Sequence, residues 1–430
     1  MKTYKLNNLS STEIKSLYKR PSIHLEETIE IVKPILADIK KNGLNAAIKY
    51  AKKFDQFTGE NILVTKEEFE KAEDNLSESV KTALRIAAKN IEAFHKEQLP
   101  KSYEVETMPG VKCSREFRAI ENVGLYIPGG NAVLPSTMLM LGIPAKLAGC
   151  KRIVACSPSK KNKVNDEVLF AARLAGVTEF YGIGGAQAIA LLAYGDNQIK
   201  KVDKIFGPGN QFVTAAKLLV SIDTEGCAID MPAGPSEVLI IADEFANPEY
   251  IAADLLSQAE HGADSQVVLL SNSEKFITDV KDELEKQLSV LPRKEFAEKS
   301  LGSSFALLVN NLDEAFYFSN NYAPEHLILH LDNAENYKSK IINAGSVFLG
   351  KYSPESVGDY ASGTNHSLPT YSYAKSFSGV SVESFMKAVT FQSLTKEGLK
   401  LIGSTVETLA EVESLLAHKN AVTIRLKNEN

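Results

Sequence analysis

The feature that most constrains the fold of this chain is a repeated alternation of short apolar runs with helical segments, from about residue 118 to residue 381. The runs include VGLYI, RIVACS, EVLIIAD, QVVLLS and LILHL, and the gaps hold segments such as NQFVTAAKLLVS and PEYIAADLLSQAEHG. Strands that are apolar on both faces belong to buried parallel sheets, which need a helical crossover between successive strands. The alternation therefore predicts an α/β fold built on mostly parallel sheets.

Two stretches rich in glycine and proline divide this α/β region. They read YIPGGNAVLPST at residues 126–137 and DMPAGPSEV at residues 230–238. Such clusters mark turns and domain boundaries, and the block between them is long enough to fold as a unit. We expect two Rossmann-like, incomplete parallel-sheet domains. Residues 126–236 form the inserted α/β domain, and residues 25–125 together with 237–380 form the main α/β domain.

The two ends of the chain are predicted to be helical extensions. Residues 1–24 precede a segment with apolar positions at helical spacing, IEIVKPILADIKKNGLNAAIKYAKKF. After residue 381 the strand pattern stops, and residues 381–430 show helical apolar faces with no sheet of their own to cover. We therefore expect this C-terminal tail to pack on another part of the assembly.

Charge and cysteine content narrow the environment and the partners of the protein. The 48 Lys and Arg residues against 54 Asp and Glu residues give a net charge of −6, and neither sign forms a block. Nucleic acid and membrane surfaces are therefore not expected partners. No apolar stretch approaches the roughly 18 residues of a membrane span. The four cysteines show no CxxC pair, and the N-terminus has no apolar leader, so we expect a cytoplasmic protein.

Several polar residues stand where they can carry chemistry. In SQAEHG, Gln258 and His261 are three apart on a predicted helix, so both can meet one metal ion, although such a pair also forms a plain surface hydrogen bond. The Gly-rich loop ESVGDYASGTNHS carries Asp359 and His366, and loops of this composition are often functional. Asp359 can supply a hard oxygen to zinc or manganese, or it can cap a turn.

Glu325 and His326, in NYAPEHLILHL, lie at the start of a predicted strand. Adjacent strand residues face opposite ways, so both can serve one site only at the irregular start of the strand. There a carboxylate and an imidazole can share general acid/base work, because both titrate near neutrality when their surroundings are adjusted. His330, inside the apolar run, is interpreted as a structural residue.

For the remaining candidate residues and motifs, the sequence pattern alone fits a functional role and a purely structural role equally well. Glu413 and His418, in EVESLLAHKN, can share a ligand only if the helix ends between them or near Asn420, and otherwise they form an ordinary solvated helix end. The turns in YIPGG, GIGGAQAIA and FGPGN follow strands and lead into helices. That geometry either holds phosphate groups or is plain topology.

The chain resembles the histidinol dehydrogenase family in eight motifs that occur in the same order. They are YIPGG, GIGGAQAIA, FGPGN, DMPAGPSEVLIIAD, LLSQAEHG, APEHL, GDYASGTNH and EVESLLAHKN. The resemblance implies oxidation of L-histidinol through L-histidinaldehyde to L-histidine in histidine biosynthesis, with two NAD per turnover and one zinc ion (Zn2+) per subunit. It also implies a homodimer with sites shared between the subunits. Residues 126–236 would then bind NAD, and residues 381–430 would pack on the partner subunit.

The resemblance also implies a role for each candidate residue by its place in these motifs. The implied zinc ligands are Gln258, His261, Asp359 and His418. The implied catalytic pair is Glu325 and His326. The implied substrate contacts are the four zinc ligands together with Ser236, His326, His366 and Glu413. The implied NAD contacts are Tyr126, Gln187 and Asn210.

In this interpretation zinc positions the substrate, because the imidazole and the amine of histidinol are both good zinc ligands. His326 takes the carbinol proton as hydride leaves for NAD, and Glu325 activates the water that adds to the aldehyde. The residues alone leave three alternatives: an NAD-linked dehydrogenase of another amino alcohol, a zinc hydrolase in which Glu325 activates a metal-bound water, and a non-catalytic binding protein of two α/β lobes.

Overall fold

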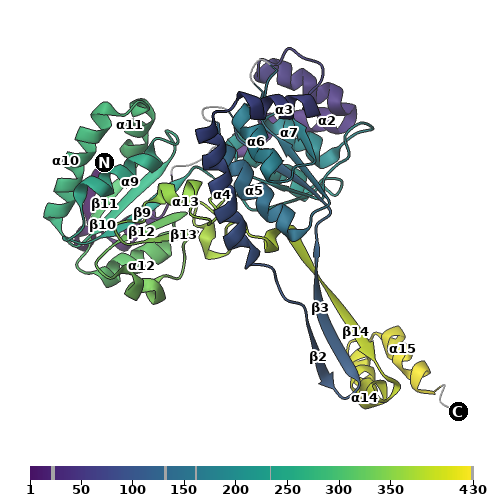
Figure 1. Ribbon diagram of the computed structural model, residues 1–430. Helices are drawn as coiled ribbons and strands as arrows, with labels where there is room; N and C mark the ends of the chain where they lie inside the picture. Colours follow the sequence, from purple (N-terminus) through teal and green to yellow (C-terminus); the bar gives the residue numbers. More distant parts are fainter. Residues whose placement is uncertain (21–24, 130–132, 160–161, 233, 428–430) are drawn as a thin grey trace.

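The computed structural model of the chain describes residues 1–20, 25–129, 133–159, 162–232 and 234–427. It contains two α/β bodies, each around a parallel sheet, and an arm that projects from one of them (Figure 1). None of the helices in these ranges combines the length and the apolar character needed to span a membrane. The predicted α/β class with two incomplete Rossmann-like sheets is confirmed.

The first body is built on a six-stranded sheet between two layers of helices. Its strands are β1 (Lys2–Lys5), β9 (Glu237–Ala242), β10 (Gln266–Ser271), β11 (Phe305–Leu308), β12 (His326–His330) and β13 (Ser346–Leu349). They lie in the order β1-β11-β10-β9-β12-β13, each parallel to its neighbours. Its helices are α1 (Ser11–Leu17), α9 (Pro248–Ala259), α10 (Glu274–Val290), α11 (Lys294–Gly302), α12 (Leu312–Tyr322) and α13 (Glu355–Tyr360), with the 3-10 helices η1 (Leu6–Asn8), η2 (Ala334–Lys340) and η3 (Tyr373–Lys375). Because successive strand residues point to opposite faces, Val238 and Ile240 pack against α9, α10 and α11, whereas Leu239 and Ile241 pack against α12 and α1.

The second body is built on a five-stranded parallel sheet. Its strands are β4 (Asn122–Tyr126), β5 (Arg152–Cys156), β6 (Glu179–Tyr181), β7 (Lys204–Phe206) and β8 (Ala228–Ile229), in the order β6-β5-β4-β7-β8. Its helices are α2 (Leu25–Phe54), α3 (Lys66–Asn75), α4 (Glu78–Lys96), α5 (Pro135–Ala148), α6 (Asp166–Leu174), α7 (Gly185–Tyr194) and α8 (Gln211–Ile222). The same alternation places Val154 and Cys156 against α2, α7 and α8, and Ile153 and Ala155 against α4, α5 and α6.

The packing of α2, α3 and α4 differs from the division expected from the sequence. We expected residues 25–125 to join residues 237–380 in one domain. Instead α2 packs on α7 and α8, α3 on α6, and α4 on α5, so these helices cover the five-stranded sheet. The expected helical extension at residues 1–24 begins with β1, which adds an edge strand beside β11. An amphipathic helix reveals its apolar face but not which sheet that face covers, so periodicity could not assign these helices.

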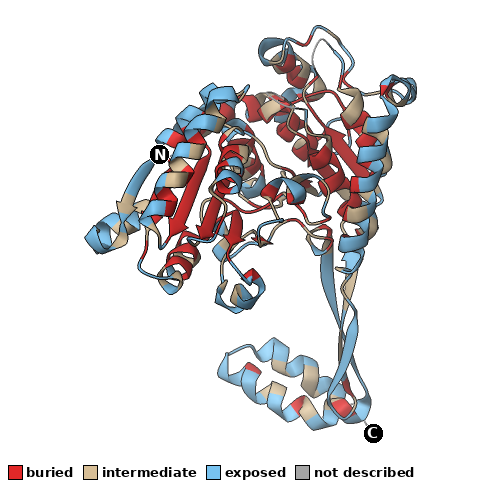
Figure 2. Ribbon diagram, turned by 60° about the vertical axis from the view of Figure 1, so that its left-hand side comes forward, coloured by how far each residue is buried: buried red, intermediate tan, exposed pale blue. Residues whose placement is uncertain are grey.

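The arm is an antiparallel sheet with two helices at its tip (Figure 1). It consists of β2 (Tyr103–Met108), β3 (Val111–Ala119) and β14 (Met386–Leu394), with α14 (Lys396–Val412), α15 (Leu416–Lys427) and the preceding 3-10 helix η4 (Glu383–Phe385). The expectation that strands stop after residue 381 is therefore wrong. In MKAVTFQSL every residue after Met386 is exposed (Figure 2), so this strand has no buried face to give it the pattern of a core strand.

The two parallel sheets face each other through opposite edges. The five-stranded sheet contributes its carboxyl edge, where β4, β7 and β8 lead into Pro128, Gly207 and Asp230. The six-stranded sheet contributes its amino edge, where Ser236 and Glu325 precede β9 and β12. Ligands of open α/β sheets usually bind outside the carboxyl ends of the strands, beside the first strand, where the strand order reverses. The five-stranded sheet thus presents its usual binding edge, and the six-stranded sheet presents the other.

Candidate active site

A cavity of about 520 Å³ lies between these two edges. It is lined by eight of the residues singled out in the sequence: Ser236, Gln258, His261, Glu325, His326, Asp359 and His366 from the first body, and Asn210 from the second. The fold therefore gathers at one place residues that are widely separated along the chain.

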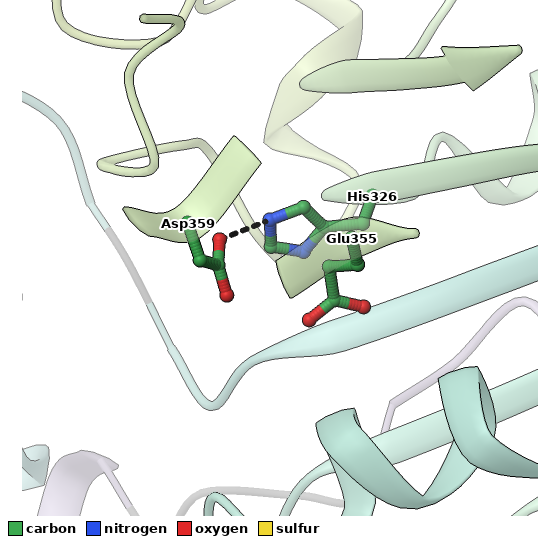
Figure 3. A group of neighbouring side chains, drawn as sticks. All are labelled: His326, Glu355 and Asp359. Atoms are coloured by element: carbon green, nitrogen blue, oxygen red, sulfur yellow. Dashed lines mark ion pairs between the residues drawn. The ribbon is translucent and has the colours of Figure 1, made fainter. Parts of the chain in front are cut away.

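His326 is the first residue of β12 and is only 4% exposed. Its Nδ1 lies 3.3 Å from the backbone oxygen of Glu237 on the neighbouring strand, so Nδ1 is assigned the hydrogen and donates to that oxygen. Its Nε2 lies 3.5 Å from Oδ1 of Asp359 (Figure 3) and is buried without a hydrogen-bond partner among the described residues. The backbone thus fixes the tautomer and leaves Nε2 as the nitrogen able to accept a proton.

Glu325 is held against the start of β9 by two hydrogen bonds. The backbone N–H of Glu237 donates to Oε2 of Glu325 at 2.9 Å, and the backbone N–H of Glu325 donates to Oε1 of Glu237 at 3.2 Å. The same Oε2 lies 3.6 Å from Nδ1 of His326. Burial raises the pKa of Glu325 to about 8, because desolvation outweighs the attraction of His326. A carboxyl group with this pKa can accept a proton near neutrality, as a general base must.

His326 is surrounded by carboxylates. Burial lowers the pKa of His326, but the charges of Glu355 and Glu325 and the contact with Asp359 outweigh that effect and raise it to about 10. Burial raises the pKa of Glu355 well above its ordinary value. Without a bound cation, the raised pKa values of Glu325 and Glu355 mean that protons balance the charge of these acids. A divalent cation bound beside them would replace those protons and favour the ionised carboxylates.

Gln258 lies in the last turn of α9 and His261 in the turn that follows, so the predicted helix ends between these two residues. Gln258 is fully buried, and its amide nitrogen is assigned toward Glu355, 3.0 Å from Oε2, because the ionised carboxylate of Glu355 accepts hydrogen bonds and cannot donate them. Nδ1 of the exposed His261 lies 2.9 Å from the backbone oxygen of Ser257, so Nε2 is the nitrogen that can bind a ligand. An amide oxygen, an imidazole nitrogen and the carboxylate of Asp359 make a donor set that zinc accepts.

Asp359 lies on α13 and His366 on the loop that follows, so the first part of the stretch expected to be a loop is helical. Nδ1 of His366 lies 2.8 Å from the backbone oxygen of Asp359, and Nε2 lies 3.0 Å from the hydroxyl of Thr137 on α5. Burial lowers the pKa of His366, which favours the neutral ring. The loop therefore belongs to the first body but is anchored on the second, across the cavity.

The residues expected to contact NAD lie at the carboxyl edge of the five-stranded sheet. Tyr126 ends β4, Gln187 is in the first turn of α7, and Asn210 caps α8. The Tyr126 hydroxyl accepts from the Gly185 backbone N–H at 3.1 Å, and Nε2 of Gln187 donates to Asp55 at 2.8 Å. Of the three, Asn210 lines the cavity, whereas Tyr126 and Gln187 lie buried behind it.

Glu413 and His418 do not reach the cavity of their own chain. Both are exposed, at the end of α14 and on α15, and the tip of the arm projects away from the two bodies (Figure 1). The arm places these residues far from the other candidates within one subunit. Residues 130–132, part of the expected YIPGG turn, lie outside the described residues.

Sequence reasoning missed three buried residues that support the site, namely Arg20, Glu237 and Glu355. Arg20 forms a bidentate ion pair with Glu237, with Nε–Oε2 at 2.5 Å and Nη2–Oε1 at 2.8 Å, and its guanidinium lies 3.5 Å from the centre of the Tyr322 ring. The signal for Glu237 is its place at the head of the apolar strand EVLIIAD, because a carboxylate buried there needs a cationic partner.

One group of three His, Cys, Asp or Glu residues in the described part of the chain is close enough to hold a metal ion. It comprises His326, Glu355 and Asp359, whose ligand atoms lie within 4.8 Å of one another (Figure 3). It shares only Asp359 with the ligand set expected from the sequence. Both sets place a cation at the same wall of the cavity.

Comparisons with known proteins agree on one family. The family model described as histidinol dehydrogenase matches residues 18–426. The chain is 52% identical over 430 residues to the chloroplastic histidinol dehydrogenase of Arabidopsis thaliana, covering 100% of this chain and 92% of that protein. It is 52% identical over 411 residues to the histidinol dehydrogenase of Bacteroides thetaiotaomicron, covering 95% and 96%. The crystal structure of histidinol dehydrogenase from Elizabethkingia anophelis matches with a TM-score of 0.95 at 51% identity, covering 99% and 98% of the two chains.

Proposed function

The chain belongs to the histidinol dehydrogenase family, and we propose that the cavity between the two sheets is where it oxidises L-histidinol. The protein is an NAD-dependent oxidoreductase of histidine biosynthesis. This location is supported by the lining of the cavity, which has Glu325, His326, Asp359 and His261 on one side and Asn210 on the other. Membership of the family decides against the hydrolase and the non-catalytic binding protein.

Zinc is proposed to bind Gln258, His261 and Asp359 of one subunit together with His418 of a second subunit. The acids clustered beside His326 support a cation at this wall, because Glu355 and Asp359 lie close enough to His326 for their ligand atoms to surround one ion. When bound, zinc supplies ligand positions for the imidazole and amine of histidinol, and so restricts the orientation of the carbinol. His326 is left out of the ligand set, because an imidazole bound to metal cannot also accept a proton.

In the first oxidation His326 is the base. A cation bound beside Glu355 and Asp359 would offset the carboxylate charges that raise the pKa of His326, and so favour the neutral ring. The Nδ1–H of that ring is held by the Glu237 carbonyl, so Nε2 can accept the hydroxyl proton while the carbinol hydrogen leaves as hydride for NAD. The carbon–oxygen single bond becomes the carbonyl of the aldehyde, and one NADH and one proton are released. Ser236 and His366 line the same cavity and are proposed to contact the substrate.

In the second oxidation Glu325 is the first base. Its carboxylate accepts a proton from the water as the water oxygen adds to the aldehyde carbon, and a proton passes to the former carbonyl oxygen to complete the hydrate. The raised pKa of Glu325, about 8, suits this role. His326 then removes a proton from a hydroxyl of the hydrate as the second hydride leaves for NAD. The products are the carboxylic acid, a second NADH and a second proton.

NAD is proposed to bind at the carboxyl edge of the five-stranded sheet, near Tyr126, Gln187 and Asn210. Gly207, which follows β7, supports this placement. It has a φ of 122°, and a Cβ there would collide with the Tyr126 carbonyl, so the turn brings two backbones together where β4 and β7 diverge. This is the reversal point where open α/β sheets bind dinucleotides.

A homodimer is proposed in which the arm of each subunit packs on the other and delivers Glu413 and His418 to its site. Most of the arm is exposed (Figure 2), and its exposed residues include the apolar Val389, Phe391 and Val412, the last 78% exposed. The four cysteines are unpaired, which supports a reducing compartment such as the cytoplasm.

The stoichiometry of NADH production tests the proposed chemistry. Complete turnover of histidinol with excess NAD should give two NADH per substrate molecule. Glu325→Gln keeps the shape of the side chain but removes the base, so oxidation of histidinol to the aldehyde should survive better than oxidation of the aldehyde to the acid. An equal loss in both steps would contradict the assignment of Glu325 to the water.

A further inference from the structure

Glu355 is a buried acid whose role the proposed chemistry leaves unexplained. It begins α13, is only 1% exposed, and has no Lys or Arg partner among the ion pairs of the described residues. Its carboxylate points beneath the His326 ring (Figure 3). Burying a carboxylate without a cationic partner is costly, so its neighbours have to account for its presence.

The contact that Glu355 makes is with the Gln258 amide. Both carboxylate oxygens face the amide nitrogen, with Oε2 at 3.0 Å and Oε1 closer. The amide oxygen then faces the backbone N–H of Glu237 at 3.3 Å, a donor that it shares with Oε2 of Glu325 at 2.9 Å. If the amide were reversed, its oxygen would face two carboxylate oxygens and its nitrogen would face an N–H. The two neighbours together therefore fix which end of this amide is the oxygen.

That choice matters because only one atom of a glutamine amide binds a metal ion. The oxygen has lone pairs to offer, whereas the nitrogen does not, so a reversed amide removes one ligand from the set. Side chains that orient metal ligands from behind commonly change metal affinity by about 10- to 100-fold when replaced.

We propose that Glu355 is a positioning residue, which accepts hydrogen bonds from the Gln258 amide nitrogen and so keeps the amide oxygen available as a metal ligand. The inference rests on the proposed zinc site. It assigns Glu355 no contact with the substrate and no proton to transfer. It also predicts that zinc affinity depends more on which of residues 258 and 355 donates the hydrogen bond, and which accepts it, than on the charge of Glu355 alone.

The test is metal retention by the full-length protein, measured as zinc content after equilibrium dialysis against a series of chelator concentrations. Glu355→Gln preserves volume but presents both a donor and an acceptor to Gln258, so the amide is free to reverse. We expect zinc affinity to fall by about 10- to 100-fold. The exchange variant Gln258→Glu/Glu355→Gln restores a donor facing an acceptor and keeps the total charge, and it should recover most of that loss.

Asp254→Asn is the matched control for charge. Asp254 lies one helical turn before Gln258 on α9, is buried, and acts on Glu355 through its charge. Its replacement removes a neighbouring negative charge but leaves the Gln258–Glu355 contact, so zinc affinity should change much less than in Glu355→Gln. Circular dichroism and the melting temperature of each metal-free variant show whether it is folded.

The outcomes separate this inference from the proposed function. A wild-type protein that holds no divalent metal would overturn the zinc site and the inference with it. A wild type that holds zinc, with Glu355→Gln holding it equally well, overturns the role of Glu355 alone. Equal losses in Glu355→Gln and Asp254→Asn, or no recovery in a folded exchange variant, would also overturn it, because the effect would then come from charge or packing.

Discussion

The two α/β bodies have matching strand orders, but they present opposite edges to the cavity. In each sheet the first strand is central, the next two lie on one side, and the last two lie on the other, with β1 as an added edge strand in the first body. The five-stranded sheet presents its carboxyl edge, with Gly-rich turns and the starts of helices. The six-stranded sheet presents its amino edge, with buried acids and an imidazole at the starts of its strands.

The two edges suit different functions, namely binding of the cofactor and positioning of the catalytic base. Turns at a carboxyl edge offer backbone N–H groups and close approach to a ligand, which suits the binding of a cofactor. The first residue of a buried strand has its backbone fixed by the adjacent strand, which suits a base that must keep one position. At the start of β12 the neighbouring Glu237 fixes both Glu325 and His326, through its backbone and its carboxylate.

The largest effect should come from the amino edge, in His326→Asn. Loss of the base should lower the rate of both half-reactions by about 10²- to 10⁴-fold, because a proton leaves oxygen in each. The measurement is NADH formation from histidinol and, separately, from histidinaldehyde. His330→Asn, at the other end of the same strand, is the control and should keep most of the activity. Similar losses in the two variants would mean that the site is not confined to the amino edge.

The ion pair between Arg20 and Glu237, which lies behind the amino edge, should contribute to the free energy of unfolding. Arg20→Met leaves the Glu237 carboxylate buried without its partner, and the free energy of unfolding should fall by about 3–5 kcal/mol. Lys5→Met breaks an exposed ion pair with Glu274 in the same body and should cost less than about 1 kcal/mol. Urea unfolding of the two variants gives the comparison, and a cost for Arg20→Met near that of Lys5→Met would show that the amino edge does not depend on this pair.

A third test asks whether the two edges of one subunit make a complete site. His261→Asn and His418→Asn should each be inactive alone. After dissociation and reassociation of a mixture, about half the dimers are mixed, and in each of these one site carries both lesions and the other carries none. Recovery should approach about a quarter of wild-type activity. If mixed dimers form and no activity returns, His418 acts within its own subunit.

Much of the fold and of the proposed site could be predicted from local pattern. The apolar strands predicted both sheets, and the spacing of Gln258 and His261 predicted that both face one site, although α9 ends between them. The pattern could not show which sheet α2 and α4 cover, because their apolar faces fit either. It also missed β14, whose side chains are exposed in the single chain, and Glu355, which is buried beside Gln258 although the two residues lie far apart in the sequence.

At the carboxyl edge a smaller and more selective effect is expected from Asn210→Ala. Loss of one hydrogen bond to the cofactor should raise the KM for NAD by about five- to tenfold, with the KM for histidinol nearly unchanged. Asn210 also caps α8, so Asn210→Ser, which keeps a capping oxygen, separates the two roles. An increase in the KM for histidinol equal to that for NAD would contradict the assignment of cofactor binding to the carboxyl edge.

The smallest effect concerns one hydrogen bond between the two bodies, made by His95 and Asn365. His95 of α4 is fully buried in the second body, where Nδ1 lies 2.9 Å from the backbone oxygen of Ile91. Its Nε2 lies 3.3 Å from the amide nitrogen of Asn365, the residue before His366 in the loop of the first body. Nε2 must be unprotonated to accept from that amide, and burial lowers the pKa of His95 below its ordinary 6.5.

The sign of the pH dependence follows from that lowered pKa. As the pH falls below about 6.5 the unfolded chain binds a proton at His95 before the folded protein does, so the free energy of unfolding decreases. The decrease stops once folded His95 is also protonated. His95→Gln cannot titrate, so the difference in unfolding free energy between wild type and variant should shrink on acidification, by about 1 kcal/mol. A difference that is constant with pH would mean that His95 does not link the bodies as a neutral acceptor.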